Sequence, residues 1–170
     1  MPILVKPTKT KLAWSDFTVS SDALQDDEAE AGYGSEFRPA VFKPRNIKGR
    51  AHLPATYTIR VWPKHRLAPG ADKTAELLAH EQVHYDVGIV CARALARDLK
   101  GVNGADPDEL LTLIDGLHDL HMLTRAGAIQ DAYDTQTKHG HDSTKQKEWE
   151  TAMAQCLAST TMTRIMGLPL

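Results

Sequence analysis

Apolar residues recur at helical spacing over residues 71–100. This segment contains no proline, and its one glycine is Gly88. Asp72 near its start and Gly101 just after Lys100 are typical of the two ends of a helix. The pattern predicts a long helix. Its apolar positions are Leu77, Leu78, Val83, Val87, Val90, Cys91, Ala94 and Leu95.

Two further helices are predicted in the second half of the chain. The first begins at Pro107 with Asp106 as its N-cap, because proline suits the first helical position. A turn at residues 139–143 separates it from the last helix. The predicted spans are 107–138, with a break near Gly116 or Gly127, and 144–165.

The first third of the chain is predicted to be β structure. The clearest strand is 55–62, where β-branched and aromatic residues alternate with others. Residues 11–19 predict a strand or strand-turn, and residues 36–43 predict a strand that its proline restricts to an edge or a bulge. The acidic stretch 20–34 is expected to form a loop, and the connection 63–70 is expected to end the sheet.

Strands followed by helices are typical of the α+β class. We therefore expect a small N-terminal antiparallel sheet followed by about three long helices. The length of 170 residues suits a single domain over residues 1–170 with a sizeable core.

Composition narrows the class of protein and its partners. The 42% hydrophobic and 25% charged residues are ordinary for a soluble globular protein. A net charge of −2 gives no reason to expect nucleic acid or an anionic membrane surface as a partner. No apolar run approaches the roughly 20 residues of a membrane helix. Residues 1–15 lack the apolar core of a signal peptide, so the compartment stays open: the protein remains inside the cell, or this is a mature form.

The two cysteines, Cys91 and Cys156, lie in predicted helices. Their spacing forms neither a thiolate metal site nor a redox pair. They are expected to be small core residues. A disulfide between the two helices is the alternative in an oxidising compartment.

The candidate chemistry lies in the first predicted helix, which contains the sequence H-E-Q-V-H. His80 and His84 are separated by one helical turn, so both imidazoles lie on one face and can bind one zinc ion. Glu81 lies between them and is the candidate general base for a metal-bound water. The motif therefore predicts a hydrolytic zinc site.

A catalytic zinc site needs a third protein ligand and an open position. The metzincin pattern is excluded, because it requires glycine and histidine where this chain has Val87 and Val90. The third ligand must come from elsewhere. The candidates are His139 and His141, Asp134, His118 and His121, and Glu148 and Glu150.

The corner 133–140 is the favoured source, because it gathers an imidazole, a carboxylate, a phenol and a hydroxyl. Each residue also has a structural alternative. His139 could interact with a helix dipole, and Asp134 could orient a ligand imidazole. Tyr133 is either a core residue or a donor to the developing oxyanion. For His118 and His121 the expectation is two surface histidines.

These motifs resemble a bacterial domain family of otherwise unknown function, described as predicted secreted zinc-dependent proteases. The helix of that family reads H-E-Q-x-H-[FY]-D and continues into A-R-x-L. A downstream Y-D-x-x-T-x-H-G follows, then Gln and Trp. The resemblance covers about residues 12–155. The matching residues are Trp14, Asp16, Phe17, 80–86, 92–95, Tyr133, Asp134, Thr137, His139, Gly140, Gln146 and Trp149.

The resemblance implies a zincin-like metallopeptidase, with His80 and His84 as zinc ligands and Glu81 as the catalytic base. It also implies that the corner belongs to the site, with His139 as the expected third ligand and Asp134 as the alternative. Members of the family are usually exported. In zincins the substrate lies along an edge strand, and by analogy strand 55–62 is expected to take that role.

We therefore expect a zinc-dependent enzyme that hydrolyses peptides or proteins, with Tyr133 assisting Glu81 in catalysis. One alternative is a non-catalytic domain whose structural zinc is closed by a fourth ligand, Asp134 or His141. Another is a metal-dependent hydrolase for a bond other than a peptide bond. The sequence does not reveal the cleavage specificity or the oligomeric state.

Overall fold

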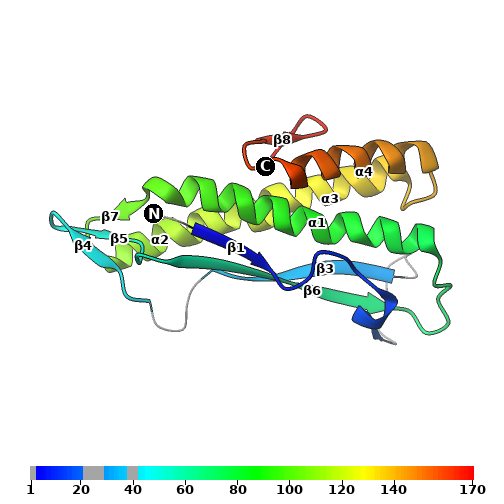
Figure 1. Ribbon diagram of the computed structural model, residues 1–170, viewed down its shortest axis with the longest axis horizontal. Coiled ribbons are helices and arrows are strands. Elements are labelled where there is room, and N and C mark those ends of the chain that lie inside the picture. Colours follow the sequence, from blue (N-terminus) through cyan, green and yellow to red (C-terminus); the bar gives the residue numbers. More distant parts are fainter. Residues whose placement is uncertain (1–2, 21–28, 38–41) are drawn as a thin grey trace.

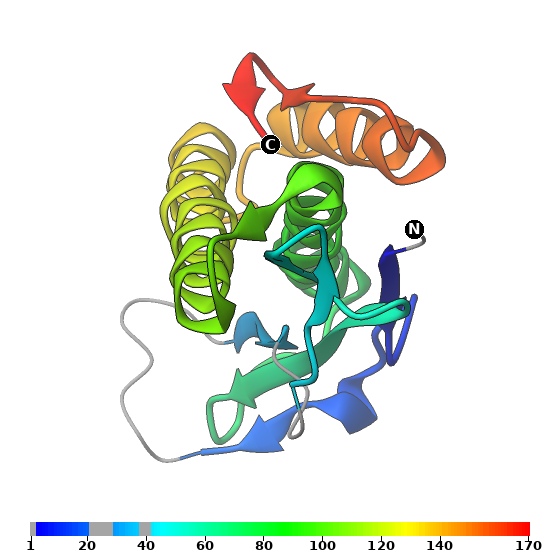
Figure 2. The same ribbon diagram turned by 90° about the vertical axis from the view of Figure 1, so that its left-hand side faces the viewer.

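A computed structural model of the protein describes residues 3–20, 29–37 and 42–170. A sheet lies on one side, and the helices cover it in two further layers (Figure 1). The end-on view shows α1 (Ala75–Asp98) in the centre, between the sheet and the other helices (Figure 2). The α+β class, with an N-terminal sheet followed by three helical segments, is confirmed.

The main sheet is built around its longest strand, β6 (Tyr57–Leu67). Along one edge of β6 run β1 (Ile3–Pro7) and β2 (Thr18–Val19), both parallel to it. Along the other edge β3 (Ala29–Glu36) runs antiparallel, from Ala29 opposite Leu67 to Glu36 opposite Arg60. The sheet is therefore mixed, and the prediction of an antiparallel sheet is correct for the β3 pairing alone.

Two strand predictions are wrong. β6 is the central strand rather than the edge, and β3 is an edge strand although its residues were expected to form a loop. β6 also continues through Pro63, which was placed in a connection. Pro63 falls between the last residue paired with β1 and the first paired with β2, so its missing N–H interrupts no ladder on that side. Most of the predicted strand 36–43 lies outside the described residues.

Short strands and turns complete the molecule. They are β4 (Arg45–Ile47), β5 (Arg50–His52) and β7 (Asn103–Gly104) in a second sheet, the hairpin β8 (Arg164–Ile165) and β9 (Leu168–Pro169), and the 3₁₀ turns η1 (Trp14–Asp16) and η2 (Leu99–Gly101). The β8–β9 hairpin occupies the end of the segment that was predicted as helix to residue 165. That helix ends at Ala158 instead.

The helices begin where the sequence offers caps. The Thr74 hydroxyl accepts a hydrogen bond from the N–H of Leu77 at the start of α1, two residues after the predicted signal at Asp72. Asp106 caps α2 (Pro107–His118) as predicted. Neither predicted glycine breaks the second helix. Instead a π-helical segment, η3 (Asp119–Arg125), joins α2 to α3 (Ala126–Thr137), and α4 (Ser143–Ala158) follows.

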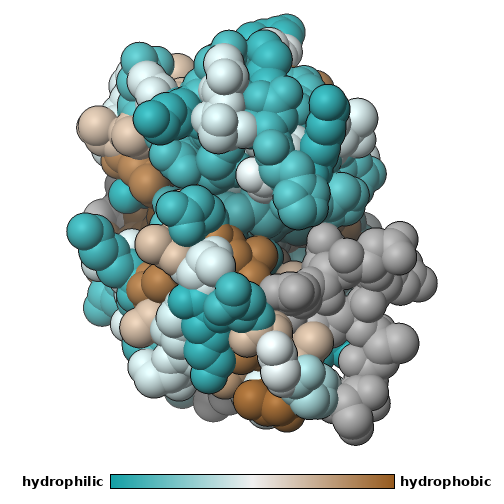
Figure 3. Space-filling model, turned by 90° about the vertical axis from the view of Figure 1, so that its right-hand side faces the viewer, coloured by the Kyte–Doolittle hydropathy of each residue, from teal (hydrophilic) through white to brown (hydrophobic). Residues whose placement is uncertain are grey.

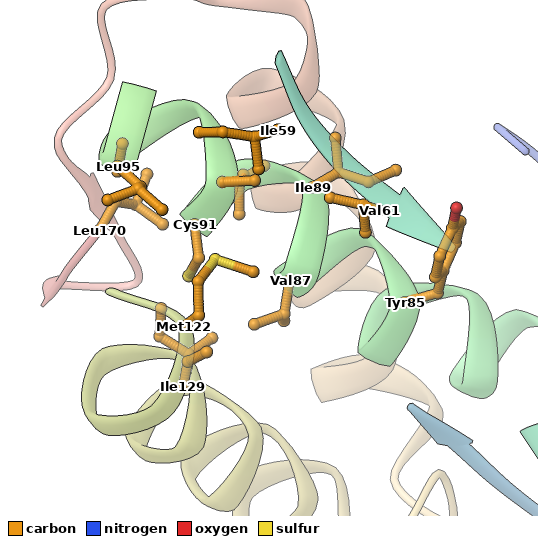
Figure 4. Packing of buried hydrophobic residues seen from close by; sticks show 14 of the residues in the cluster. Ile59, Val61, Tyr85, Val87, Ile89, Cys91, Leu95, Met122, Ile129 and Leu170 are labelled. Atoms are coloured by element: carbon orange, nitrogen blue, oxygen red, sulfur yellow. The ribbon is translucent and has the colours of Figure 1, made fainter. Parts of the chain in front are cut away.

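The hydrophobic core surrounds α1, because this helix is covered on several sides. Ile89 packs toward Ile59 and Val61 of β6, whereas Val87 and Cys91 point toward the helical segments η3 and α3 (Figure 4). Close packing needs Gly88, since a Cβ atom there would lie 2.4 Å from Cγ of Tyr33 on β3.

Cys91 and Cys156 are both free and buried, as expected of core residues. Burial raises the pKa of the Cys91 thiol to about 12, so it stays protonated at neutral pH. Across the described residues no helix has the length and apolar character to cross a bilayer, in agreement with the sequence analysis.

Candidate metal centre

His80 and His84 lie on the buried face of α1 and point toward each other. Their side chains are 5% and 9% exposed, and the two Nε2 atoms are 3.2 Å apart. The rings are nearly perpendicular, with 4.8 Å between their centroids. One helical turn of spacing has thus directed two nitrogen atoms to one point, as the sequence predicts.

Asp134 on α3 supplies a carboxylate at the same point. Its Oδ1 atom is 2.9 Å from Nε2 of His84 and 3.3 Å from Nε2 of His80. These three residues form a group that could hold a metal ion. Ligands on a tetrahedral zinc at about 2.0–2.1 Å are roughly 3.3 Å from one another. The three measured separations are close to that value, so the donor atoms fit a small divalent cation.

The hydrogen bonding and charge of the group also suit a cation. The Asp134 Oδ1 atom is buried, and its polar contacts among the described residues are with the two imidazole nitrogens. Burial alone would raise the pKa of this carboxyl, but its contacts with His80 and His84 hold the pKa well below its usual range. Asp134 is therefore an ionised oxygen donor next to two imidazoles, which suits a divalent metal.

The corner after α3 contributes to the site differently from the prediction. Lys138, His139 and Gly140 all have positive φ angles, of 51°, 53° and 83°. The His139 side chain is exposed and is not part of the metal-binding group, whereas the alternative ligand Asp134 is. The corner reaches the ligands through Gly140, where a Cβ atom would lie 3.3 Å from Cγ of His80.

Thr137 explains how the corner holds this shape. Its hydroxyl donates to the carbonyl of Tyr133 at 2.8 Å and lies 3.3 Å from the N–H of Gly140, from which it accepts. The backbone N–H of His139 donates to the carbonyl of Asp134 at 3.0 Å. These bonds satisfy the open carbonyls at the end of α3 and place Gly140 beside His80.

Tyr133 lies behind the ligands, in the core. Its ring is fully buried and stacks on His80, with 4.7 Å between the centroids. Its hydroxyl donates to Oε1 of Gln146 at 2.7 Å, and the carbonyl of His80 is 3.2 Å away. Burial raises the pKa of this phenol well above its ordinary value. This placement matches the core alternative, because a hydroxyl bound inside the protein does not face an incoming carbonyl.

Glu81 is 2% exposed and lies between α1 and the edge strand. Its Oε2 atom accepts a hydrogen bond of 2.5 Å from the N–H of Ala31 on β3. β6 occupies the other edge of β3, so this N–H points away from the sheet. Glu81 therefore joins the helix of the two histidines to the free edge of the sheet.

The remaining candidate ligands lie outside the group. His118 lies 3.2 Å from the Ser35 hydroxyl and stacks on Phe37. His121 is 1% exposed and its Nε2 atom is 2.8 Å from Asp98, so it is a buried, paired histidine rather than the expected surface one. None of His118, His121, His141, Glu148 and Glu150 joins the metal-binding group of the described residues.

The molecular surface shown in Figure 3 differs in hydropathy between the helices and the sheet. The helical part is mainly hydrophilic, and hydrophobic patches lie toward the sheet. The Asp134 side chain is 26% exposed, whereas its Oδ1 atom, which faces the two histidines, is buried.

Comparison with known protein families, with characterised proteins and with solved structures finds no match for this chain. The interpretation of the site therefore depends on its own geometry. That geometry is a His80, His84 and Asp134 group with a buried glutamate on the neighbouring helical position.

Proposed function

We propose that this protein is a zinc-dependent metallopeptidase with His80, His84 and Asp134 as its zinc ligands. The observation that carries the proposal is the convergence of the two Nε2 atoms and one carboxylate oxygen within 3.3 Å of one another. Two imidazoles, one carboxylate and an open position make up a ligand set used by catalytic zinc. Asp134 replaces His139 as the proposed third ligand.

A zinc ion bound there would polarise a substrate carbonyl and lower the pKa of a water molecule. Glu81 would take the proton from the attacking water and pass it to the nitrogen of the leaving amine. Such a base must be held in place, and the N–H of Ala31 does this by donating to its carboxylate.

The edge of β3 favours a peptide as the substrate. Among the described residues β3 pairs with no strand except β6, and the outer N–H of Ala31 donates to Glu81, so a peptide would have to pair with the other outer N–H and C=O groups. Glu81 lies against this same edge through Ala31. A peptide added to β3 would therefore pass beside the proposed general base.

A structural zinc site is less well supported. Closed structural sites have four protein ligands, and in the described part of the chain the group contains three.

The test compares Glu81→Gln with the wild type and with Glu76→Gln, an exposed glutamate on the first turn of the same helix. The wild type and both variants should bind about one zinc, measured by elemental analysis. Hydrolysis of an unfolded protein substrate should fall by about 10²–10⁴-fold in Glu81→Gln and stay unchanged in Glu76→Gln. Full activity of zinc-loaded Glu81→Gln would exclude Glu81 as the base. Zinc binding without hydrolysis in the wild type would favour the structural alternative.

A further inference from the structure

Gln146 on α4 lies directly behind one of the two histidines. It is 8% exposed, and its Oε1 atom is 3.2 Å from Nδ1 of His80. An amide oxygen can only accept, so the nitrogen that faces it must carry the proton. This places a proton on Nδ1 of His80 and makes Nε2, the atom that faces Asp134, the nitrogen that could bind a metal.

The orientation of the Gln146 amide is itself fixed. Its Nε2 atom donates to a carboxylate oxygen of Glu150, one turn along α4, at 2.9 Å. The opposite orientation would bring the amide oxygen against that carboxylate, where two acceptors repel each other. Tyr133 adds a second restraint, because its hydroxyl donates to Oε1 at 2.7 Å. Oε1 thus receives two donors, one for each lone pair.

We propose that Gln146 is a positioning residue that holds a proton on Nδ1 of His80 and so orients the ring, with Glu150 fixing its amide and Tyr133 sharing its oxygen. The consequence is that Nε2 is aimed at the metal position before a metal arrives. Partners of this kind raise metal affinity by orienting the imidazole and making it more basic. The inference rests on the metal centre of the proposed function but does not require that the protein cleaves peptides.

The second histidine provides an internal contrast. Nδ1 of His84 is buried and has no hydrogen-bond partner among the described residues. The two ligands are therefore not equivalent, and the Nδ1 proton of His80 alone should respond to a change at position 146.

The first measurement is the exchange of the histidine ring N–H protons with solvent in the metal-free protein, from ¹H–¹⁵N NMR spectra. The wild type should show a slowly exchanging, hydrogen-bonded Nδ1–H on His80. In Gln146→Met that proton should exchange rapidly, and the ring resonances of His84 should stay unchanged. The second measurement is the zinc affinity from competition with a chromogenic chelator. Gln146→Met should bind zinc about 10–100-fold more weakly.

Two variants separate positioning from simple loss of packing. Gln136→Met removes the hydrogen bond of 3.0 Å that Trp149 of α4 donates to Gln136 of α3, and should leave zinc affinity and the His80 Nδ1 proton unchanged. The double variant Gln146→Glu with Glu150→Gln restores an oxygen acceptor next to His80 and a donor at position 150. It should recover both the slowly exchanging Nδ1 proton and the affinity.

The outcomes are distinct. A slowly exchanging Nδ1 proton and wild-type zinc affinity in Gln146→Met would overturn the inference, as would equal losses in Gln136→Met. If the wild type binds no zinc, the proposed metal centre fails, and the exchange of the His80 Nδ1 proton in the metal-free protein still decides the role of Gln146. Loss of that protected proton in Gln146→Met with recovery in the double variant would establish that role.

Discussion

Replacing Gly88 by alanine tests the closest approach between α1 and the sheet. The new Cβ atom would lie 2.4 and 2.5 Å from Cγ and Cδ1 of Tyr33. Carbon atoms in ordinary contact are about 3.5–4.0 Å apart, so the ring must move by roughly 1 Å. The ring is anchored at its far end, because its hydroxyl donates to the carbonyl of Met122 at 2.8 Å. It can retreat only by breaking this bond or by moving β3.

The expected free-energy change combines three contributions. Overpacking of this kind costs about 1–3 kcal/mol. Loss of the Tyr33 hydrogen bond costs about 0.5–1.5 kcal/mol. Alanine is a better helix former than glycine in a helix interior by about 1 kcal/mol, which offsets part of the cost. Gly88→Ala should therefore destabilise the protein by about 0.5–3.5 kcal/mol, whereas helix propensity alone predicts stabilisation.

Urea unfolding followed by circular dichroism measures this change. Gly116→Ala is the matched control, since Gly116 is an exposed glycine of α2 with no atom within 4 Å of an added Cβ. The control should be more stable than the wild type by up to about 1 kcal/mol. The cost of Gly88→Ala should also shrink when Tyr33 is first replaced by alanine, because the clash is then removed.

Stabilisation by Gly88→Ala equal to that by Gly116→Ala would refute this reasoning. It would mean that the Tyr33 ring does not pack against α1 at Gly88.

Three further predictions concern the site and the core. Asp134→Ala should lose more zinc affinity than the roughly 100-fold that an outer partner can account for, whereas His139→Ala should keep it; equal losses by chelator competition would contradict the ligand assignment. Tyr133→Phe should keep its stacking and lose about 0.5–1.5 kcal/mol in urea unfolding with its one hydrogen bond; an unchanged midpoint would argue against that bond. Burial holds the pKa of His65 below its ordinary 6.5, so the unfolded chain binds the proton more readily and stability should fall as pH falls through about 6.5. His65→Phe should flatten this fall in urea titrations from about pH 7.5 to 5.5, and an identical slope in both proteins would rule out His65 as its source.

The sequence predicted the helices well because their signals are local. The periodic apolar residues of α1 and the Asp106–Pro107 start of α2 need no knowledge of the rest of the chain. The end of α4 was missed because the helix gives way after Ala158 to a short hairpin. The π-helical segment between α2 and α3 was also missed, because a helical repeat does not reveal where its hydrogen bonds shift.

β3 was missed because its glycines serve packing rather than turns. A Cβ atom at Gly34 would lie 2.3 Å from the ring of Trp62, so this strand needs a residue without a side chain. In the sequence, Gly32 and Gly34 within an acidic stretch instead indicate a loop. The parallel pairing of β1 and β2 with β6 depends on distant contacts that no local pattern records.

The site was predicted to within a short segment but not to the atom. The motif placed His80 and His84 together, and the resemblance placed the corner beside them. The choice between His139 and Asp134 depended on the left-handed turn at Lys138 and His139, a conformation that is uncommon for residues other than glycine. Gln146 and Glu150 could have been singled out by their spacing of one helical turn on α4, but nothing in that spacing identifies His80 as their partner.

The ligands come from helices far apart in the chain, and this has a consequence for folding. A cation shared by His84 on α1 and Asp134 on α3 would act as a reversible cross-link that closes a loop of roughly 50 residues. A permanent link across such a loop removes chain entropy worth about 4 kcal/mol from the unfolded state. Withdrawal of the ion would therefore loosen the attachment of α3 to α1 and expose the chain to proteolysis, so that metal supply would set the lifetime of the protein.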